Sequence, residues 1–275
     1  MHKRILLALD LEGVNFVVGE PYLGLSKGTD QWKVAVAQAV KEINAAADAL
    51  YAAGAEKVEL WDNHGGGNNI AADDLDSRIT LLSPDLKQPR QYFAEGQYDC
   101  ICFFGYHAME GTLGGVLAHT MNSKLNQYYK LNGRYVGEVD MDAQIALSHN
   151  MASCFFAGGD IACAQAERAV PGIVTVVTKK ELSRNEAEFR DNDELLAEIR
   201  EKIVEAVQGD ARPAAWEYPV QVEKSFKRME DAAIYLKRVR TLGLTADYPA
   251  DEILGHDAHS VVSAVNNIGE FIKSI

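Results

Sequence analysis

The sequence predicts an α/β fold with a mostly parallel central sheet flanked by helices, and a smaller C-terminal α+β domain or lobe. Short apolar runs without polar interruption, such as residues 5–9, 100–104 and 152–157, are typical of strands covered on both faces. A long helical pattern lies between the first two strands, and this βαβ order makes neighbouring strands parallel. Later stretches are more charged and alternate in polarity. We therefore expect a large domain at residues 1–190 and a smaller one at 191–275.

The first βαβ unit follows from apolar spacing and capping residues. Residues 5–9 form the first predicted strand, and residues 57–61 form the second. Between them, residues 31–53 are rich in alanine and place apolar side chains at helical spacing. Thr29 or Asp30 can cap the start of this helix, and a glycine follows its end.

The later elements are predicted from the same patterns. Asn132 and Gly133 stand between tyrosine-containing flanks and give a strong hairpin signal within residues 125–136. Residues 84–98 are expected to form a loop and a partial helix. The further strands are expected at 79–82, 100–104, 152–157, 173–177 and 220–226. The further helices are expected at 137–148, after Asp160 through Arg168, and at 185–208, 232–239 and 259–275.

Composition limits the classes of function. Apolar residues make up 47% of the 275 residues, so the chain can bury a sizeable core. Its formal charge of −13 argues against binding to nucleic acid or anionic membranes, which need basic surfaces. The four cysteines lack zinc-finger spacing, and three of them lie in or beside apolar runs, which indicates buried, reduced thiols.

The start of the chain does not resemble a targeting segment. Lys3 and Arg4 precede a short apolar run, but this run ends at Asp10 and is too short for the core of a signal peptide. No stretch reaches the length of a transmembrane helix. We therefore expect a cytoplasmic protein.

Two acidic residues follow the first buried strand. Asp10 and Glu12 are two positions apart, and in an extended chain such side chains point to the same side, about 7 Å apart. They can therefore reach one point just beyond the end of the strand. A solvated turn with two acids is the alternative, but acids directly after a buried run need compensation for lost hydration.

Other polar side chains also follow predicted strands. His64 comes after the second strand and His107 after a later one, while Glu138 begins a helix. In open α/β sheets, ligands bind at the carboxyl ends of the parallel strands. We therefore expect these residues at one edge of the sheet. Asp62 and Asp160 also follow strands, but we interpret both as helix or turn caps.

A second histidine follows closely on His107. Glycines at 111, 114 and 115 break the segment between them, and His119 comes directly after. Two imidazoles on a tightly packed loop suit a site for a metal ion and for catalysis. Two ordinary loop histidines are the alternative.

The candidate metal ligands are two imidazoles and three carboxylates, namely Asp10, Glu12, His64, His107 and Glu138. This set suits zinc, and also manganese, cobalt or iron, and it lacks the thiolates of a structural zinc site. Five ligands exceed what one catalytic zinc ion usually takes from a protein. They match two ions about 3.5–4 Å apart if one carboxylate bridges them. The residues alone therefore favour a metal-dependent hydrolase.

Competing motifs are weaker. Three glycines at 65–67 follow a strand, but no Lys-Ser/Thr pair follows them and no G-x-G-x-x-G opens a helix. No G-x-S-x-G nucleophile motif is present. His149, His256 and His259 have no acidic neighbour at a strand end, so structural or surface roles fit them better.

Several segments, in this order, resemble the zinc-dependent D-aminopeptidase family of the dipeptide-transport type. They are ALDLEG, WDNHGGGNN, FFGYHA, GVLAHTM, YVGEVDMDA and FAGGD, followed by KKELSRNEA. The likeness covers most of residues 5–190 and continues more loosely to the C-terminus. The ordered set is specific, although any one of these motifs alone is not.

The resemblance implies a site with two zinc ions per subunit. Asp10 corresponds to the carboxylate that bridges both ions. Glu12 and His64 complete the ligands of one ion, and His107 and Glu138 those of the other. All five residues are already among the candidates at the strand ends.

The resemblance also implies an activity, the removal of the N-terminal residue from short peptides or amides of D-amino acids. His119 matches the family's catalytic histidine, which is described there as a nucleophile. We expect it to act as a base or hydrogen-bond donor beside a metal-bound hydroxide that attacks the scissile carbonyl. The family is also known for ring-shaped homo-oligomers, up to decamers.

Two departures from the family pattern lie near the expected ligands. Asn63 replaces a small hydroxyl residue, and the loop at residues 14–19 differs; both bear on substrate choice. A metal-dependent amidase or phosphoesterase of the same fold is one alternative function. A metal- or nucleotide-binding module without catalysis is another, but such a module needs no His119.

Overall fold

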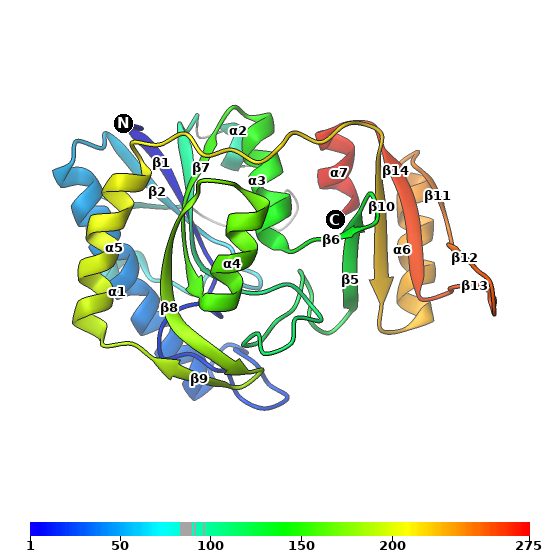
Figure 1. Ribbon diagram of the computed structural model, residues 1–275, viewed down its shortest axis with the longest axis horizontal. Helices are drawn as coiled ribbons and strands as arrows, with labels where there is room; N and C mark the ends of the chain where they lie inside the picture. Colours follow the sequence, from blue (N-terminus) through cyan, green and yellow to red (C-terminus); the bar gives the residue numbers. More distant parts are fainter. Residues whose placement is uncertain (83–89, 91, 96) are drawn as a thin grey trace. The chain divides into compact units, whose positions relative to one another are not determined.

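The computed structural model describes residues 1–82, 90, 92–95 and 97–275 (Figure 1). Within these residues the chain forms two compact units. Unit 1 comprises Met1–Ala108, Leu113–Leu117 and Asp142–Ala214, whereas unit 2 comprises Met109–Thr112, Ala118–Met141 and Ala215–Ile275. Each unit is built on a sheet of its own.

The sheet of unit 1 has the strand order β3-β2-β1-β4-β7-β8-β9 within the described residues. Its neighbouring strands are parallel up to β8, and β9 pairs with β8 in the antiparallel sense. The predicted α/β class with a mostly parallel sheet is confirmed. The strands are β1 Arg4–Leu9, β2 Lys57–Asp62, β3 Thr80–Leu82, β4 Cys100–Tyr106, β7 Ala152–Gly159, β8 Val174–Ser183 and β9 Glu186–Phe189.

Helices cover this sheet and bury its apolar side chains. α1 and α5 lie side by side (Figure 1), and their apolar faces share one core with Ile5, Leu7 and Leu9 of β1. Thr29, one of the two predicted caps, accepts a hydrogen bond from the backbone N–H of Trp32 at the start of α1. The helical elements are α1 Asp30–Ala52, η1 Ala72–Asp74, α2 Tyr92–Glu95, α3 Glu138–Ser148, α4 Asp160–Ala169 and α5 Asn192–Ala206.

Unit 2 is built on an antiparallel sheet with the order β11-β14-β10-β5-β6. Asn132 and Gly133 form the predicted hairpin turn between β5 and β6, both with positive φ (49° and 79°). The elements are β5 Asn126–Leu131, β6 Arg134–Tyr135, β10 Val220–Phe226, α6 Met229–Thr241, β11 Thr245–Asp247, β12 Ala250–Asp251, β13 Gly255–His256, β14 Ser260–Val265 and α7 Ile268–Ser274.

Two predicted helices are wrong in part. The helix expected at 259–275 is the strand β14 followed by the short helix α7, because a run of valines here pairs with β10 and β11. The helix expected at 185–208 begins only at Asn192, where Asp191 accepts hydrogen bonds from the first turn. The residues before it form β9 instead. Of the expected partial helix at 84–98, α2 is observed, and 84–89, 91 and 96 lie outside the described residues.

The boundaries of the two compact units do not coincide with a single division at residue 190. α5 belongs to unit 1, because Leu195, Ile199 and Ile203 are buried in the core that includes α1. The hairpin β5–β6 belongs to unit 2, because β5 pairs with β10, about ninety residues further along the chain.

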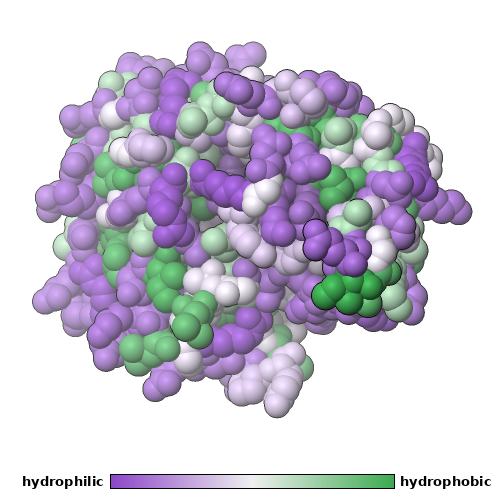
Figure 2. Space-filling model, turned by 45° about the vertical axis from the view of Figure 1, so that its right-hand side comes forward, coloured by the Kyte–Doolittle hydropathy of each residue, from purple (hydrophilic) through white to green (hydrophobic). Residues whose placement is uncertain are grey.

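The surface and the cysteines agree with the composition. On the face shown in Figure 2, hydrophilic side chains predominate and hydrophobic ones form small patches. All four cysteines are buried and unbridged. Among the described residues, none of the helices combines the length and apolar character needed to span a bilayer.

Candidate metal centre

The strand order of unit 1 reverses next to β1. The chain runs from β1 outward to β2 and β3, and then returns to the other side of β1 as β4. Ligand sites of open α/β sheets form at such a switch point, beyond the carboxyl ends of the strands. Asp10 follows β1, His64 follows β2 and His107 follows β4, so all three lie at this edge.

Two glycines let the chain segment after β1 touch the end of β4. The backbone N–H of Gly13 donates to the carbonyl of Gly105 at 2.6 Å. A Cβ atom at Gly13 would lie 2.1 Å from the carbonyl oxygen of Tyr106, and one at Gly105 would lie 2.0 Å from that of Asp10. Gly105 also has a φ of +67°, which favours glycine. The close approach brings the side chains after both strands together.

Asp10 lies between two imidazoles. Its Oδ1 is 2.8 Å from Nδ1 of His64, and its Oδ2 is 3.4 Å from Nε2 of His107. Glu12 reaches the same point, with Oε2 3.1 Å from Nδ1 of His64. One ligand atom from each of Asp10, Glu12 and His107 lies within 4.8 Å of the others. Sequence reasoning placed these four residues at one strand edge, and the structure brings them together.

Charge compensation holds this cluster together. Burial raises the pKa of Asp10, but the hydrogen bonds from His107 and His64 outweigh burial and hold this pKa well below its usual range. Burial lowers the pKa of His64, but the nearby carboxylates of Glu12 and Asp10 raise it well above its usual range. Metal ligands bind in their deprotonated forms, so a proton on His64 competes with a bound cation, and metal affinity falls with falling pH.

The chemistry of the donors fits zinc. Carboxylate oxygen and imidazole nitrogen are the donors of catalytic zinc sites, and thiolates, typical of structural sites, are missing from this cluster. Nδ1 of His107 lies 3.0 Å from the carbonyl oxygen of Ala108 and donates to it, and the other ring nitrogen, Nε2, faces Asp10. Such a backbone contact fixes the tautomer of metal-binding histidines.

The other predicted site residues lie in unit 2. Glu138 is buried at the start of α3, and its Oε1 accepts a hydrogen bond from the backbone N–H of Met121 at 2.8 Å. His119 precedes Thr120, whose Oγ1 accepts from the backbone N–H of Glu110. The roles of Glu138 and His119 stay predictions.

The two acids interpreted as caps make structural hydrogen bonds. Asp62 accepts from the backbone N–H groups of Asn69 (2.6 Å) and Ile70 (3.3 Å), and it thereby closes the loop that carries His64. Asp160 accepts from the backbone N–H of Glu181 at 2.8 Å.

A polar network that sequence reasoning missed supports the loop of His64. The side-chain amide of Asn63 donates to the hydroxyl of Tyr106 at 3.1 Å, and this hydroxyl donates to buried Asp142 at 3.0 Å. Arg90 pairs with the same carboxylate. Asn63, which replaces a small hydroxyl residue of the family pattern, therefore has a hydrogen-bond partner in Tyr106 of β4.

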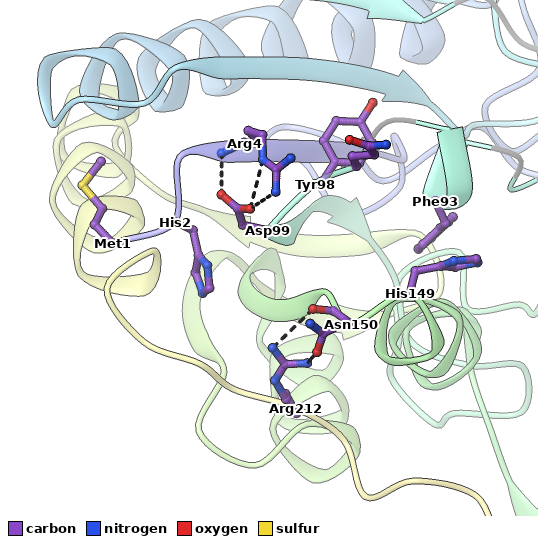
Figure 3. Close-up of a pocket in the computed structure, with 10 residues that line it drawn as sticks. Met1, His2, Arg4, Phe93, Tyr98, Asp99, His149, Asn150 and Arg212 are labelled. Carbon is purple, nitrogen blue, oxygen red and sulfur yellow. Dashed lines mark hydrogen bonds and ion pairs between the residues drawn. The ribbon is translucent and has the colours of Figure 1, made fainter.

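A separate pocket of about 580 Å³ opens at the opposite, amino end of the strands in unit 1 (Figure 3). Its cationic groups are already engaged, because Arg4 pairs with Asp99 and Arg212 donates to Asn150. The pocket contains none of the predicted site residues.

Comparison with known proteins agrees with the zinc-type donor set of the site. A family model described as D-aminopeptidase matches residues 3–259. The chain belongs to the D-aminopeptidase family. The predicted resemblance is thereby confirmed.

Two relatives of this family illustrate the likeness. The D-aminopeptidase of Bacillus subtilis (strain 168) is 26% identical over 185 residues, which cover 66% of this chain and 65% of that protein, so less than two thirds of the relative is matched. The solved structure of a Zn-dependent D-aminopeptidase, DppA from Bacillus subtilis, described as a self-compartmentalizing protease, superposes with a TM-score of 0.82. The two chains are 21% identical, with 98% of this chain and 94% of the other covered, which shows that they share a fold.

Proposed function

We propose that the protein is a zinc-dependent aminopeptidase that removes N-terminal D-amino acids from short peptides or amides. The observation that carries this proposal is the position of Asp10, with one carboxylate oxygen toward each of two histidines at the switch point of the sheet. Membership of the D-aminopeptidase family supports it, as do the names of the two relatives.

We assign two zinc ions to this centre. Asp10 is the proposed shared ligand, because its two oxygens face different imidazoles. Glu12 and His64 form one proposed ligand pair, and His107 and Glu138 the other. Zinc held there would supply Lewis-acid activation of water and of the scissile carbonyl.

The protein's own groups provide orientation and proton transfer. Ala108 holds His107 in the tautomer that directs Nε2 to Asp10. We assign His119 the role of base or hydrogen-bond donor at the reacting carbonyl, as the family pattern implies. Hydrogen bonds to Thr120, the next residue, support its backbone: the carbonyl accepts from the side-chain amide of Asn126 and the hydroxyl from the N–H of Glu110.

We also propose that the protein forms a homo-oligomer in the cytoplasm. The description of the structural relative as self-compartmentalizing supports an assembly, and a decamer is the state that the family resemblance implies. Four unbridged, buried thiols suit a reducing compartment. Light scattering coupled to size-exclusion chromatography measures the oligomeric state.

The decisive experiment is an assay of the zinc-loaded protein with the amides of D-alanine and L-alanine, each with and without a chelator. We expect ammonia release from the D form only, and its loss on chelation. Turnover of the L form alone would contradict the proposed specificity for D-amino acids, but it would leave the assignment as a metal-dependent hydrolase in place. If neither amide is cleaved, longer peptides and a phosphate ester complete the panel; cleavage of the ester alone would replace the proposal by a phosphoesterase.

His119 is tested separately from the metal. We expect His119→Ala to lose at least 100-fold in kcat while its zinc content stays that of the wild type. His149→Ala, which removes an exposed histidine that lines the pocket at the amino end of the strands, is the matched control and should retain full activity. Full activity of His119→Ala would remove this residue from the mechanism.

A further inference from the structure

β8 carries a fully buried lysine that the proposed chemistry does not use. Lys179 is 0% exposed, and its ammonium group donates to three backbone carbonyls, those of Glu12 (2.5 Å), Val14 (3.1 Å) and Val17 (2.6 Å). An ammonium group has three N–H donors, so all of them are used by one short loop. This loop begins with a proposed zinc ligand.

The residue before Lys179 holds the same loop. The hydroxyl of Thr178, also fully buried, donates to the carbonyl of Gly13 at 2.5 Å. Together, Thr178 and Lys179 engage the carbonyls of Glu12, Gly13 and Val14 in succession. α1 also holds the loop, because the carboxylate of Glu42 accepts a hydrogen bond from the backbone N–H of Asn15 at 3.1 Å.

Burial of an ammonium group is costly, and these contacts explain why it is tolerated here. A buried charge needs hydrogen-bond partners for each of its donors. The three carbonyls supply them, and the carboxylate of Glu181, two residues along β8, lies close enough to favour the charge. The arrangement is therefore satisfied only when the backbone of the loop follows one path. That path sets where the carboxylate of Glu12 points.

We propose that Lys179 is a positioning residue that orients Glu12 for zinc by holding the loop at residues 12–17. This inference rests on the proposed zinc site and adds to it a residue that touches neither substrate nor metal. Because Glu12 is assigned to only one of the two ions, loss of Lys179 should weaken one zinc site more than the other.

The test is a zinc titration of the metal-free protein against a chromophoric zinc chelator. In Lys179→Met we expect about 10- to 100-fold weaker binding of one zinc equivalent, as for other residues that support metal ligands, and little change in the second. Lys180→Met is the matched control, because Lys180 is exposed and pairs with Glu188 on the surface, and it should bind zinc like the wild type. Circular dichroism at the same temperature shows whether each variant is folded.

A merely structural role gives a different result. A lower unfolding midpoint of metal-free Lys179→Met is expected in either case, but a merely structural role would leave the zinc affinity of the folded variant unchanged, and this result would overturn the inference. If Lys179→Met does not fold, Thr178→Val decides, because it keeps the ammonium group and removes one hydrogen bond to the loop. We then expect about threefold weaker binding of one zinc equivalent, and wild-type binding would overturn the inference. A wild-type protein that binds no zinc would instead overturn the proposed function.

Discussion

Two buried lysines, one in each unit, are stabilised in different ways. Lys179 of β8 donates to three carbonyl oxygens. Lys224 of β10 is also buried, but its ammonium group lies over the rings of Tyr129, Phe226 and Tyr235, 4.9, 5.2 and 4.7 Å from their centroids. Among the described residues, we find no hydrogen-bond acceptor for it. Burial lowers the pKa of Lys179 to about 8 and that of Lys224 to about 7.

The comparison shows that burial alone does not tell what a charged group does. Carbonyl oxygens are directional acceptors, so Lys179 fixes a loop and depends on it. Aromatic rings attract a cation without demanding one geometry, so Lys224 fixes nothing comparable. Removing Lys179 leaves buried carbonyls without partners, whereas removing Lys224 takes away only its contacts with aromatic rings. The same substitution should therefore have opposite effects on stability in the two units.

The largest effect is expected for Lys179→Met. Three carbonyl oxygens lose their donor, and each unsatisfied buried group costs about 1–3 kcal/mol, so the free energy of unfolding should fall by about 3 kcal/mol or more. Urea denaturation of the metal-free protein measures this change. Lys180→Met provides the baseline and should change stability by less than about 0.5 kcal/mol. Equal values for the two variants would contradict the role given to the carbonyl contacts.

Lys224→Met should stabilise the protein by about 1–2 kcal/mol at pH 6, where the wild-type ammonium is buried and charged. Replacing a buried charge by an apolar side chain of similar volume is often neutral or stabilising. Urea denaturation is again the measurement, with exposed Lys237→Met on α6 as the control. Destabilisation by more than about 1 kcal/mol would mean that the three rings stabilise the cation more than its burial costs.

The pH dependence of stability sharpens the same point. Lys224 has a pKa of about 7 in the folded protein, against an ordinary value of 10.5. Between these values the folded chain has released this proton and the unfolded chain retains it, so the contribution of Lys224 to the free energy of unfolding rises with pH, on the order of 1.4 kcal/mol per unit. Below pH 7 both states are protonated and the contribution is constant.

Denaturation curves of the wild type and Lys224→Met at pH 6, 7, 8 and 9 test this. The advantage of the variant should be constant up to about pH 7 and then shrink steadily. A difference that does not vary across this range would show that Lys224 keeps its proton when folded.

The smallest effect is expected for Lys130→Met, on β5 beside β10. Lys130 is partly exposed and pairs with Glu223 at 3.0 Å. Surface ion pairs contribute about 0–1 kcal/mol, so the variant should lie within about 0.5 kcal/mol of the wild type. A loss comparable to that of Lys179→Met would undo the distinction between buried and exposed lysines.

The sequence was informative where a local pattern determines the structure. Unbroken apolar runs identified β1, β4 and β7, and the polar residues after β1, β2 and β4 identified the cluster of Asp10, His64 and His107. Chain topology explains this success, since the carboxyl ends of parallel strands necessarily share one edge. The helix α1 was equally clear from its spacing and its cap.

The misses have long-range causes. The valine-rich run of β14 fits a helix or a strand, and only its pairing with β10 and β11 decides. The role of Lys179 was also missed, because a lysine in a strand is usually exposed. Its partners are carbonyls more than 160 residues away in the chain, and no side-chain pattern encodes them. The Thr-Lys pair directly after the apolar start of β8 was the available hint.

The contact between Gly13 and Gly105 limits which substitutions this centre can accept during evolution. Any side chain at either position would push apart the two strand ends that carry Asp10 and His107. We therefore expect both positions to accept only glycine, although glycine itself contributes no functional group. In a saturation mutagenesis screen, both positions should tolerate as few substitutions as His64 and His107. Homologues with a different chemistry at this centre should differ in its side chains and keep the two glycines.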